Sequence, residues 1–172
     1  MITIEPANLR DVSWIAANMR ASDKEEIYCQ LPARATPEIV AQYSLSSSEA
    51  WTVKRNGFLF AAFGFQQMSE GVLNGWAYGR DGMERCILEI TRFVFTYKVP
   101  EWLQAGIRRI EVRTIESHVS AHRWLEAAGA ERVCALDEWG KNGERFLLYA
   151  WVCSRVPKEI KRRWTNVLQH QG

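Results

Sequence analysis

Two histidines one helical turn apart, with a glutamate just before them, are the residues of this sequence best suited to proton transfer. His118 and His122 have the i and i+4 spacing that places both side chains on one face of a helix, and Glu116 precedes them. Imidazole titrates near neutral pH, so either histidine could give or take a proton. Such pairs near a helix start are also common at surfaces and in helix caps. The spacing suits a metal ion as well, but the sequence offers no third ligand, and we expect no metal site.

A glycine-containing turn earlier in the chain could bind an anion. Gly79 and Gly82 flank Arg80 where a strand is expected to run into a helix. Backbone N–H groups at such a junction bind phosphate, glycine gives the backbone the freedom to wrap it, and arginine adds positive charge. Asp81 and Glu84 add negative charge at the same place. The alternative is an ordinary strand-to-helix turn, with Asp81 as the helix N-cap and Glu84 at position N3.

The elements that must position these residues follow first from hydrophobic periodicity in the N-terminal half. Residues 1–7 alternate apolar and polar side chains and predict a strand, and Asn8 offers the N-cap of a helix. A second helix is expected from Thr36 or Pro37 to Tyr43, because proline suits the first helical position. The apolar and aromatic residues that follow, up to Gly79, predict a three-stranded antiparallel meander, because turns at Asn56-Gly57 and at residues 69–71 divide them.

The C-terminal half alternates between helices and strands. From Met83 the apolar residues recur with a helical period, and Pro100 is expected to end that helix. A strand at residues 108–114 and a short helix capped by Ser117 follow. Residues 131–152 predict a closing hairpin. The expected order along the chain is therefore β-α-α-β-β-β-α-β-α-β-β.

This order, and the residues of the last strand and helix before the hairpin, resemble the GNAT family of acyltransferases. The family signature is an Asn, an Ala three residues on, a Tyr seven on, and Gly-Phe at eleven and twelve. Counting back from Gly129 places His118, Ala121, Leu125 and Ala130 at those positions. The framework matches, whereas His118, Leu125 and Ala130 depart from the family residues. Divergent GNAT-like proteins encoded by T7-like bacteriophages show the same departures, so the chain resembles them most.

The resemblance implies an α+β fold, with a GNAT-like, mixed, mostly antiparallel central sheet of six to seven strands flanked by about four helices. It covers residues 1–153, which we expect to form one GNAT-like domain. Residues 154–172 carry five cations and one acid, and we expect a basic C-terminal helix packed on the domain or extending from it. A basic tail could instead contact nucleic acid, a membrane surface or an acidic partner. We favour the helix and expect neither a nucleic-acid nor a membrane partner.

The resemblance also implies an acetyl-CoA site between the fourth and fifth strands. In the family these strands splay apart to hold the cofactor, and its pyrophosphate binds the loop that follows strand four. The residues at the corresponding positions are Trp76, Ala77, Tyr78, Gly79, Arg80, Gly82, Met83 and Ser117. Replacement of Arg80 and Gly82 is expected to abolish acetyl-CoA binding if the protein is a transferase.

Two catalytic roles come with the same resemblance. Family members commonly protonate the departing thiolate with a tyrosine at the position of Leu125, which cannot donate a proton, so His118 or His122 would have to replace it. A glutamate near the splayed strands commonly accepts the proton of the acceptor amine. Glu116, at the end of the fifth strand and beside the open crevice, is the first candidate. The alternatives are Glu70, Glu25 and Glu26.

Composition narrows the class of protein. A chain of 172 residues, 47% hydrophobic and 24% charged, is ordinary for one globular domain with a core. The sequence has neither a long apolar run nor a secretory signal, so we expect a cytoplasmic protein, in the host cytoplasm if a phage encodes it. The four cysteines lie far apart without a CxxC pair, which argues against a zinc site and against disulfides. We expect reduced thiols, mostly buried.

The tryptophans have two expected roles. Trp14, Trp51, Trp124 and Trp151 fall in elements whose inward faces need bulk, so we expect them in the core. Trp102 and Trp139 fall in connections expected to be exposed. Exposed tryptophans there would mark a surface for contact with a protein.

Two functional hypotheses of different class follow. The first is an N-acyltransferase that moves acetyl from acetyl-CoA to an amine of a small molecule or a host protein. The second is a phage-encoded GNAT-like protein with a degenerate cofactor site, which acts by binding a host enzyme or in virion assembly. Leu125, Ala130 and the acidic turn after strand four favour the second hypothesis.

Overall fold

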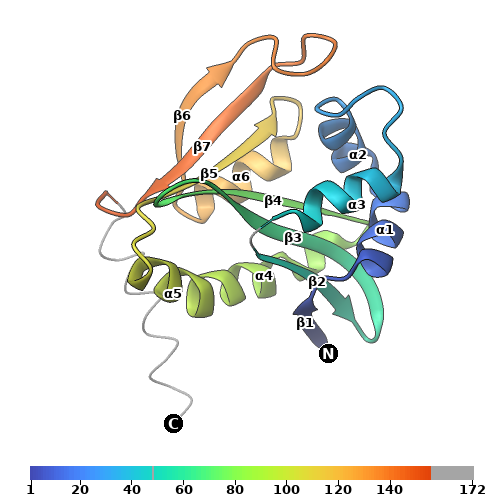
Figure 1. The fold of residues 1–172 in the computed structure, drawn as a ribbon, viewed down its shortest axis with the longest axis horizontal. Helices are drawn as coiled ribbons and strands as arrows, with labels where there is room; N and C mark the ends of the chain where they lie inside the picture. Colours follow the sequence, from blue (N-terminus) through green and yellow to red (C-terminus); the bar gives the residue numbers. More distant parts are fainter. Residues whose placement is uncertain (48, 156–172) are drawn as a thin grey trace.

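A single seven-stranded sheet with helices on both faces makes up the described part of the chain, residues 1–47 and 49–155 of a computed structural model (Figure 1). The strands are β1 (Ile2–Pro6), β2 (Glu49–Arg55), β3 (Phe58–Ser69), β4 (Val72–Gly79), β5 (Arg109–Ile115), β6 (Glu131–Leu136) and β7 (Phe146–Val152). They lie in the order β1-β2-β3-β4-β5-β7-β6, and every neighbouring pair is antiparallel except β4 and β5. The expected α+β fold class with a mixed, mostly antiparallel sheet is confirmed.

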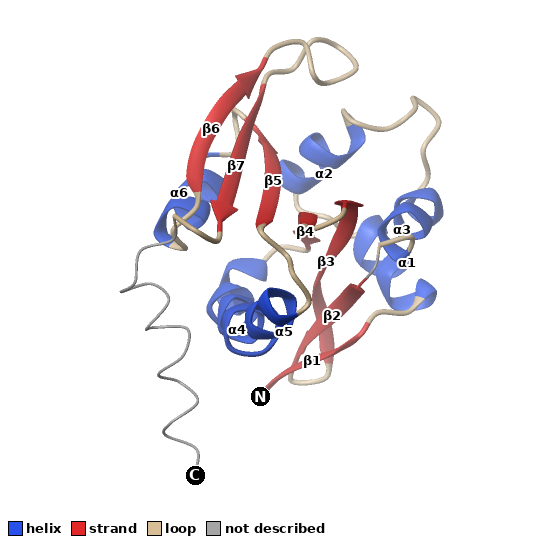
Figure 2. Cartoon of the chain, turned by 60° about the vertical axis from the view of Figure 1, so that its left-hand side comes forward, coloured by secondary structure: helices blue, strands red, loops and turns tan. Residues whose placement is uncertain are grey.

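The helices divide between the two faces of the sheet. They are α1 (Leu9–Ala17), α2 (Ala21–Tyr28), α3 (Pro37–Leu45), α4 (Ile87–Phe93), α5 (Val99–Gln104) and α6 (Val119–Ala127), with a 3-10 turn η1 (Met83–Cys86) before α4 and a π-helical turn η2 (Val94–Lys98) after it. On one face, α1 and α3 pack around Tyr78 and Ala62; on the other, η1 and α4 pack around Phe63 and Ala61. Figure 2 shows α4 and α5 on the opposite side of the sheet from α1 and α3.

Local signals in the sequence correctly predicted several element boundaries. The Asn8 side chain accepts a hydrogen bond from the Asp11 N–H at 3.0 Å and caps α1. Thr36 caps α3, with Pro37 in its first turn. Asn56 and Gly57 join β2 to β3 with φ values of 51° and 82°, the left-handed conformation that a two-residue hairpin turn requires.

The helix expected to end at Pro100 instead continues past it. Residues 83–104 form η1, α4, η2 and α5 in succession, and Pro100 lies in the first turn of α5. Because the N–H groups of a first helical turn need no intrahelical acceptor, proline is tolerated there. Trp102 is carried into the core by this continuation and is 7% exposed, so the expectation that it lies in an exposed connection was wrong.

Other expectations also failed locally. Trp14 is 42% exposed, so it is not the core residue expected on α1. The N-cap of α6 is His118 rather than Ser117, and it makes no side-chain capping hydrogen bond. The N-cap of η1 is Gly82, so Asp81 does not cap this turn.

Most of the expected C-terminal helix, residues 156–172, lies outside the described residues.

α2 was not anticipated as a helix. Its eight residues, ASDKEEIY, bury an acidic side chain, Asp23, and show no apolar stripe. Hydrophobic periodicity therefore could not detect it. Across the described ranges, every helix falls short of the length and apolar character needed to cross a membrane.

The parallel pairing of β4 with β5 is short, and the candidate site lies where this pairing ends. Residues 72–75 pair with residues 109–112, and the register ends at Gly75 and Val112. Both strands continue for several residues, β4 alongside β3 and β5 alongside β7. The sheet therefore opens between them. In Figure 2, β5, β7 and β6 stand apart from β1, β2 and β3, and α2 lies near the open end.

Candidate functional site

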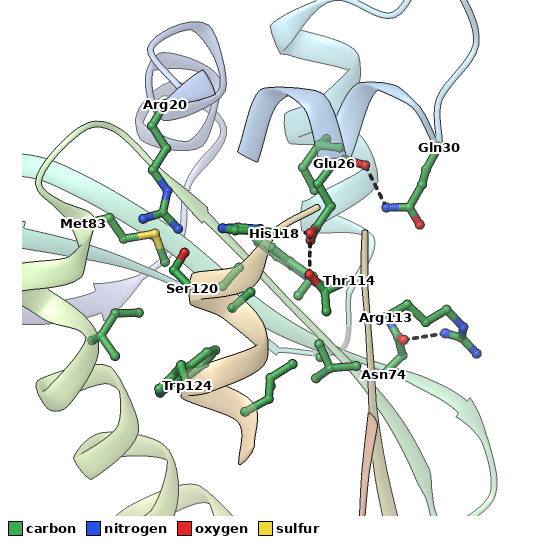
Figure 3. Close-up of a pocket in the computed structure, with 18 of the residues that line it drawn as sticks. Arg20, Glu26, Gln30, Asn74, Met83, Arg113, Thr114, His118, Ser120 and Trp124 are labelled. Carbon is green, nitrogen blue, oxygen red and sulfur yellow. Dashed lines mark hydrogen bonds and ion pairs between the residues drawn. The ribbon is translucent and has the colours of Figure 1, made fainter. Parts of the chain in front are cut away.

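A cavity of about 330 Å³ occupies the opening between β4 and β5. Side chains from β4, β5, α2, α6, the η1–α4 segment and the β6–β7 loop line it, and Figure 3 shows Glu26, His118 and Thr114 lying together. Five residues proposed from the sequence line this cavity, namely Glu26, Trp76, Ala77, Met83 and His118. The structure thus brings part of the expected cofactor site together with one of the two histidines.

Two carboxylates of α2 connect the separated ends of β4 and β5. Oδ2 of Asp23 accepts a hydrogen bond from the Gly79 N–H at 2.8 Å, at the end of β4. Oε2 of Glu26, one helical turn later, accepts hydrogen bonds from the Thr114 hydroxyl at 2.5 Å and the Ile115 N–H at 3.1 Å, at the end of β5. α2 therefore satisfies backbone groups that would otherwise be left unpaired where the ladder stops.

His118 lies between these carboxylates at the wall of the cavity. Its Nδ1 is 3.0 Å from Oε2 of Glu26, its Nε2 is 3.7 Å from Oδ1 of Asp23, and the residue is 7% exposed. Figure 3 shows the ring beside Glu26 and extending toward Arg20. Nε2 is buried and has no hydrogen-bond partner among the described residues.

The pairing with Glu26 determines which imidazole nitrogen can accept a proton. An ionised carboxylate only accepts hydrogen bonds, so the Nδ1 of His118 that faces Glu26 carries the proton. In neutral imidazole the other nitrogen, Nε2, then has a free lone pair. Both ring nitrogens thus face a carboxylate, Nδ1 that of Glu26 at 3.0 Å and Nε2 that of Asp23 at 3.7 Å.

Asp23 has a different role from Glu26. Burial raises the pKa of the Asp23 carboxyl, while Arg20, the Gly79 N–H and His118 oppose that shift. Nε of Arg20 donates to Oδ1 of Asp23 at 2.8 Å, so the buried charge is paired. With the hydrogen bond from Gly79, these contacts make Asp23 a tie between α2 and the end of β4.

The turn at residues 79–85 uses most of its backbone donors within the protein. The N–H of Gly79 donates to Asp23, that of Arg80 to the Phe60 carbonyl, and those of Met83 and Arg85 to carbonyls of the turn itself. Arg80 places its guanidinium over the rings of Trp14 and Phe60, with distances to the ring centroids of 5.7 and 5.1 Å. It is not among the residues that line the cavity.

Few backbone N–H groups of this turn remain available to bind an anion. Within residues 1–47 and 49–155, the N–H groups of Asp81 and Gly82 have no acceptor. Gly82 adopts φ +93°, a left-handed conformation that favours glycine and that occurs in backbone anion sites. The unpaired strand edges are where the pantetheine arm of a CoA thioester could lie, and these two N–H groups are the backbone donors that could bind a phosphate oxygen. The carboxylates of Asp81 and Glu84 remain unfavourable neighbours for it.

Several residues proposed from the sequence lie away from the cavity. Glu116 is exposed and its carboxylate pairs with Arg145 at 3.4 Å. The ring of His122 packs against Tyr149, and its Nε2 lies 3.1 Å from the Glu116 carbonyl. Ser117 is exposed. None of these three lines the cavity.

Tyr78 of β4 and Leu125 of α6 contribute no polar group to the cavity either. The Tyr78 hydroxyl lies 2.8 Å from the Ser44 hydroxyl on the α1–α3 face, and burial raises the pKa of Tyr78. Gly79 and Gly82 belong to the turn beyond the cavity lining. Leu125 lines the cavity but is 1% exposed and donates no proton, as the sequence indicated.

The outer rim of the cavity combines an aromatic ring with amide and guanidinium groups. Nε1 of Trp139 donates to Oε1 of Gln30 at 3.3 Å, and the Arg113 guanidinium lies 5.4 Å from the Trp139 ring centroid. Arg113 also donates to Asn74 at 2.6 Å. The Lys141 N–H donates to the Cys29 carbonyl at 2.8 Å, which ties the β6–β7 loop to the end of α2.

Sequence reasoning missed Asp23, Arg20 and Thr114, and it had Glu26 only among alternatives to Glu116. A signal was present, because Arg20, Asp23 and Glu26 recur every three residues. That spacing places charged side chains on one helical face, but the neighbouring residues gave no reason to expect that face to be buried. In the described ranges, no group of three or more His, Cys, Asp or Glu side chains could hold a metal ion.

Solved structures that match the fold of this chain include acetyltransferases, and three of the matching structures follow. One is the ribosomal-protein-S18-alanine N-acetyltransferase from Escherichia coli, at a TM-score of 0.64 and 15% identity, covering 88% of this chain and 94% of that one. Another is RimJ of Mycobacterium smegmatis in complex with CoA-disulfide, at a TM-score of 0.66 and 11% identity, covering 94% and 87%. A third is the ribosomal-protein-alanine N-acetyltransferase from Brucella melitensis, at a TM-score of 0.65 and 12% identity, covering 87% and 99%.

At the level of sequence, neither a protein-family model nor a curated protein matches this chain. At identities this low, the structural likeness shows a shared fold and says nothing about the roles of individual residues. The chain has the fold of the GNAT acetyltransferases.

Proposed function

We propose that this protein is an N-acyltransferase that moves the acyl group of acetyl-CoA to an amine of a small molecule or a protein. The side chain of His118, which lines the cavity between β4 and β5, is oriented by Glu26 and has no hydrogen-bond partner at Nε2 among the described residues, is the observation that carries the proposal. The fold supports it, since RimJ of Mycobacterium smegmatis, a structural neighbour, was solved with CoA-disulfide.

Acetyl-CoA would lie along the open edges of β4 and β5. The backbone of Trp76 and Ala77, beyond the last paired residue Gly75, has unpaired edges toward β5 that suit the amide groups of pantetheine. Met83 would contact the arm from the other side, and the N–H groups of Asp81 and Gly82 would meet the pyrophosphate. In this arrangement the acyl end would lie inside the cavity that His118 also lines.

His118 is proposed as the catalytic base, and Glu26 as the residue that orients it. The thioester supplies an acyl carbon that is open to attack. The amine nitrogen forms a bond to that carbon, the carbon–sulfur bond breaks with its electron pair going to sulfur, and the amine proton passes to Nε2 and from there to the sulfur. One imidazole would thus serve as base and then as acid, which is consistent with Leu125 at the position where the family commonly has a tyrosine.

An activity assay with two histidine variants tests this proposal. Release of free CoA thiol from acetyl-CoA is followed with a panel of amines that includes polyamines, lysine peptides and peptide N-termini. His118→Gln is expected to lower kcat about 100-fold or more, the usual contribution of a positioned acid–base group. His122→Gln is expected to retain the wild-type rate, because His122 lies outside the cavity. Equal rates for His118→Gln and the wild type would reject His118 as the base.

A second candidate function is binding without transfer, as a phage-type GNAT-like protein that contacts a host enzyme or takes part in virion assembly. The turn at residues 79–85 favours this candidate, because four of its N–H groups and the guanidinium of Arg80 are engaged within the protein. This candidate predicts that acetyl-CoA at millimolar concentration leaves the thermal midpoint of unfolding unchanged. A rise in that midpoint would favour the transferase.

A further inference from the structure

A second cavity adjoins the first where the β4–β5 pairing ends. It has a volume of about 70 Å³ and lies on the α4–α6 face of the sheet. The two cavities share five lining residues, Gly75, Trp76, Ala77, Val112 and Trp124. Since the first cavity is where the acyl end of a thioester would lie, the second is the space directly beyond that end.

The lining of the second cavity leaves no polar side-chain group for a ligand. Nε1 of Trp124 donates to the Thr91 hydroxyl at 2.9 Å, and that hydroxyl donates to the Ile87 carbonyl at 2.7 Å. Nε1 of Trp151 donates to the Ala128 carbonyl at 2.9 Å. The polar atoms of these side chains are therefore satisfied by the protein, and the surface that remains is carbon. Such a cavity favours an apolar occupant over water.

Small residues and a π-helical turn create this space. A side chain at Gly75 would place its Cβ 2.9 Å from Phe65 and 3.2 Å from Val112, so only glycine leaves room there. The π-helical turn η2 presents two consecutive residues, Val94 and Phe95, to the cavity. π-helical turns inserted in α-helices are frequent at functional sites.

The volume limits the size of the occupant. At roughly 30 Å³ for a water-sized group, the cavity has room for about two carbon atoms. It is about half the size of the ~150 Å³ apolar cavity known to bind benzene. With the thioester in the first cavity, an acetyl group would end before this space, whereas a propionyl or butyryl chain would extend into it.

We infer that the second cavity receives the acyl chain of the donor, so that propionyl-CoA and butyryl-CoA bind more tightly than acetyl-CoA. This inference rests on the proposed transferase function and deepens it, because it names the class of donor. Ala128, at the end of α6, and Val94 line the second cavity but not the first, so they would limit the length of chain that fits.

Calorimetric titration with acetyl-, propionyl-, butyryl- and octanoyl-CoA tests the inference without requiring an acceptor. Each added methylene that enters the cavity is expected to tighten binding about fourfold, which corresponds to about 0.8 kcal/mol. Affinity is therefore expected to rise about 16-fold from acetyl to butyryl and to fall at octanoyl. A flat series from acetyl to butyryl would overturn the inference and leave the transferase proposal standing. No binding of any thioester would overturn both.

Two substitutions of opposite effect link the chain-length preference to this cavity. Ala128→Val fills space and is expected to bring butyryl-CoA down to the affinity of acetyl-CoA. Ala127→Val is the matched control, because Ala127 is the exposed neighbour on the same helix and lines neither cavity. Val94→Ala enlarges the cavity and is expected to move the preferred chain beyond butyryl. If neither Ala128→Val nor Val94→Ala changes the preferred length, the acyl chain does not occupy this cavity.

Discussion

Nδ1 of His118 lies 3.0 Å from Oε2 of Glu26, although the two residues are 92 positions apart in the chain. The same carboxylate oxygen also holds Thr114 and Ile115, the last residues of β5. One glutamate of α2 therefore fixes both the open end of the sheet and the orientation of the imidazole. The position of the β5 end and the orientation of His118 therefore both depend on the carboxylate of Glu26.

Replacing Glu26 with glutamine tests whether that contact matters for catalysis. The amide of Glu26→Gln can occupy the same place but lacks the charge that stabilises an imidazolium. We expect kcat to fall about tenfold to 100-fold, part of the usual contribution of acid–base catalysis, with little change in the KM for acetyl-CoA. Glu25→Gln, an exposed position on the same helix, serves as the control. A loss confined to KM would show that Glu26 contributes to binding rather than to proton transfer.

Asp23 is expected to contribute mainly to stability. Asp23→Ala leaves the N–H of Gly79 without its acceptor and Arg20 without its partner. The unsatisfied buried donor alone costs about 1–3 kcal/mol of unfolding free energy, measured by urea denaturation. Asp81→Ala, an exposed carboxylate in the nearby turn, is expected to change that free energy by less than about 0.5 kcal/mol. Equal effects of the two substitutions would contradict the role of Asp23 as a tie.

Trp139 is expected to contribute to recognition of the acceptor. It is 46% exposed at the rim of the cavity, beside Gln30 and Arg113. Trp139→Ala is expected to raise the KM for the acceptor amine up to about tenfold, the scale of a lost aromatic contact. The affinity for acetyl-CoA, measured by calorimetry, should stay the same. Trp14→Ala removes a comparably exposed tryptophan outside the cavity, and the idea fails if it changes the acceptor KM equally.

The cysteines are expected to differ in reactivity. Burial, with a smaller contribution from nearby glutamates, raises the pKa of Cys29 to about 11. Because the thiolate is the reactive form, roughly 0.1% of Cys29 is reactive at pH 8, and this fraction grows tenfold for each unit of rising pH. Iodoacetamide at pH 8 should therefore label exposed Cys134 first, as read by mass spectrometry. All four cysteines should react in denaturant. Native labelling of Cys29 as fast as Cys134 would contradict its burial.

The sequence predicted elements best where the signal was local. Asn8 and Thr36 cap their helices, and Asn56-Gly57 turns between strands, because each signal depends on a few neighbouring residues. The sheet and the position of His118 beside the open strands followed from the order of elements and the spacing back from Gly129. These features require only the fold, which the structure confirms.

The roles of Asp23 and Glu26 could not be predicted from the sequence, because both residues lie on α2, a helix without an apolar face. α2 turns Asp23 and Glu26 inward, so the periodicity that reveals buried helices is missing. Its expected place at the end of the fifth strand, beside the open crevice, favoured Glu116, but the Glu116 carboxylate is exposed and pairs with Arg145 outside the cavity. Long-range pairing of charged residues leaves no pattern in a single sequence.

The central claim, that a CoA thioester lies between β4 and β5, is tested most directly by calorimetric titration with acetyl-CoA. The wild-type protein is predicted to bind it saturably with a micromolar dissociation constant. Ala77→Leu fills the space shared by the two cavities and should weaken binding at least tenfold, whereas Ala127→Leu on the exposed face of α6 should not. Absence of binding at millimolar acetyl-CoA, or equal binding by the Ala77→Leu variant, would contradict the account.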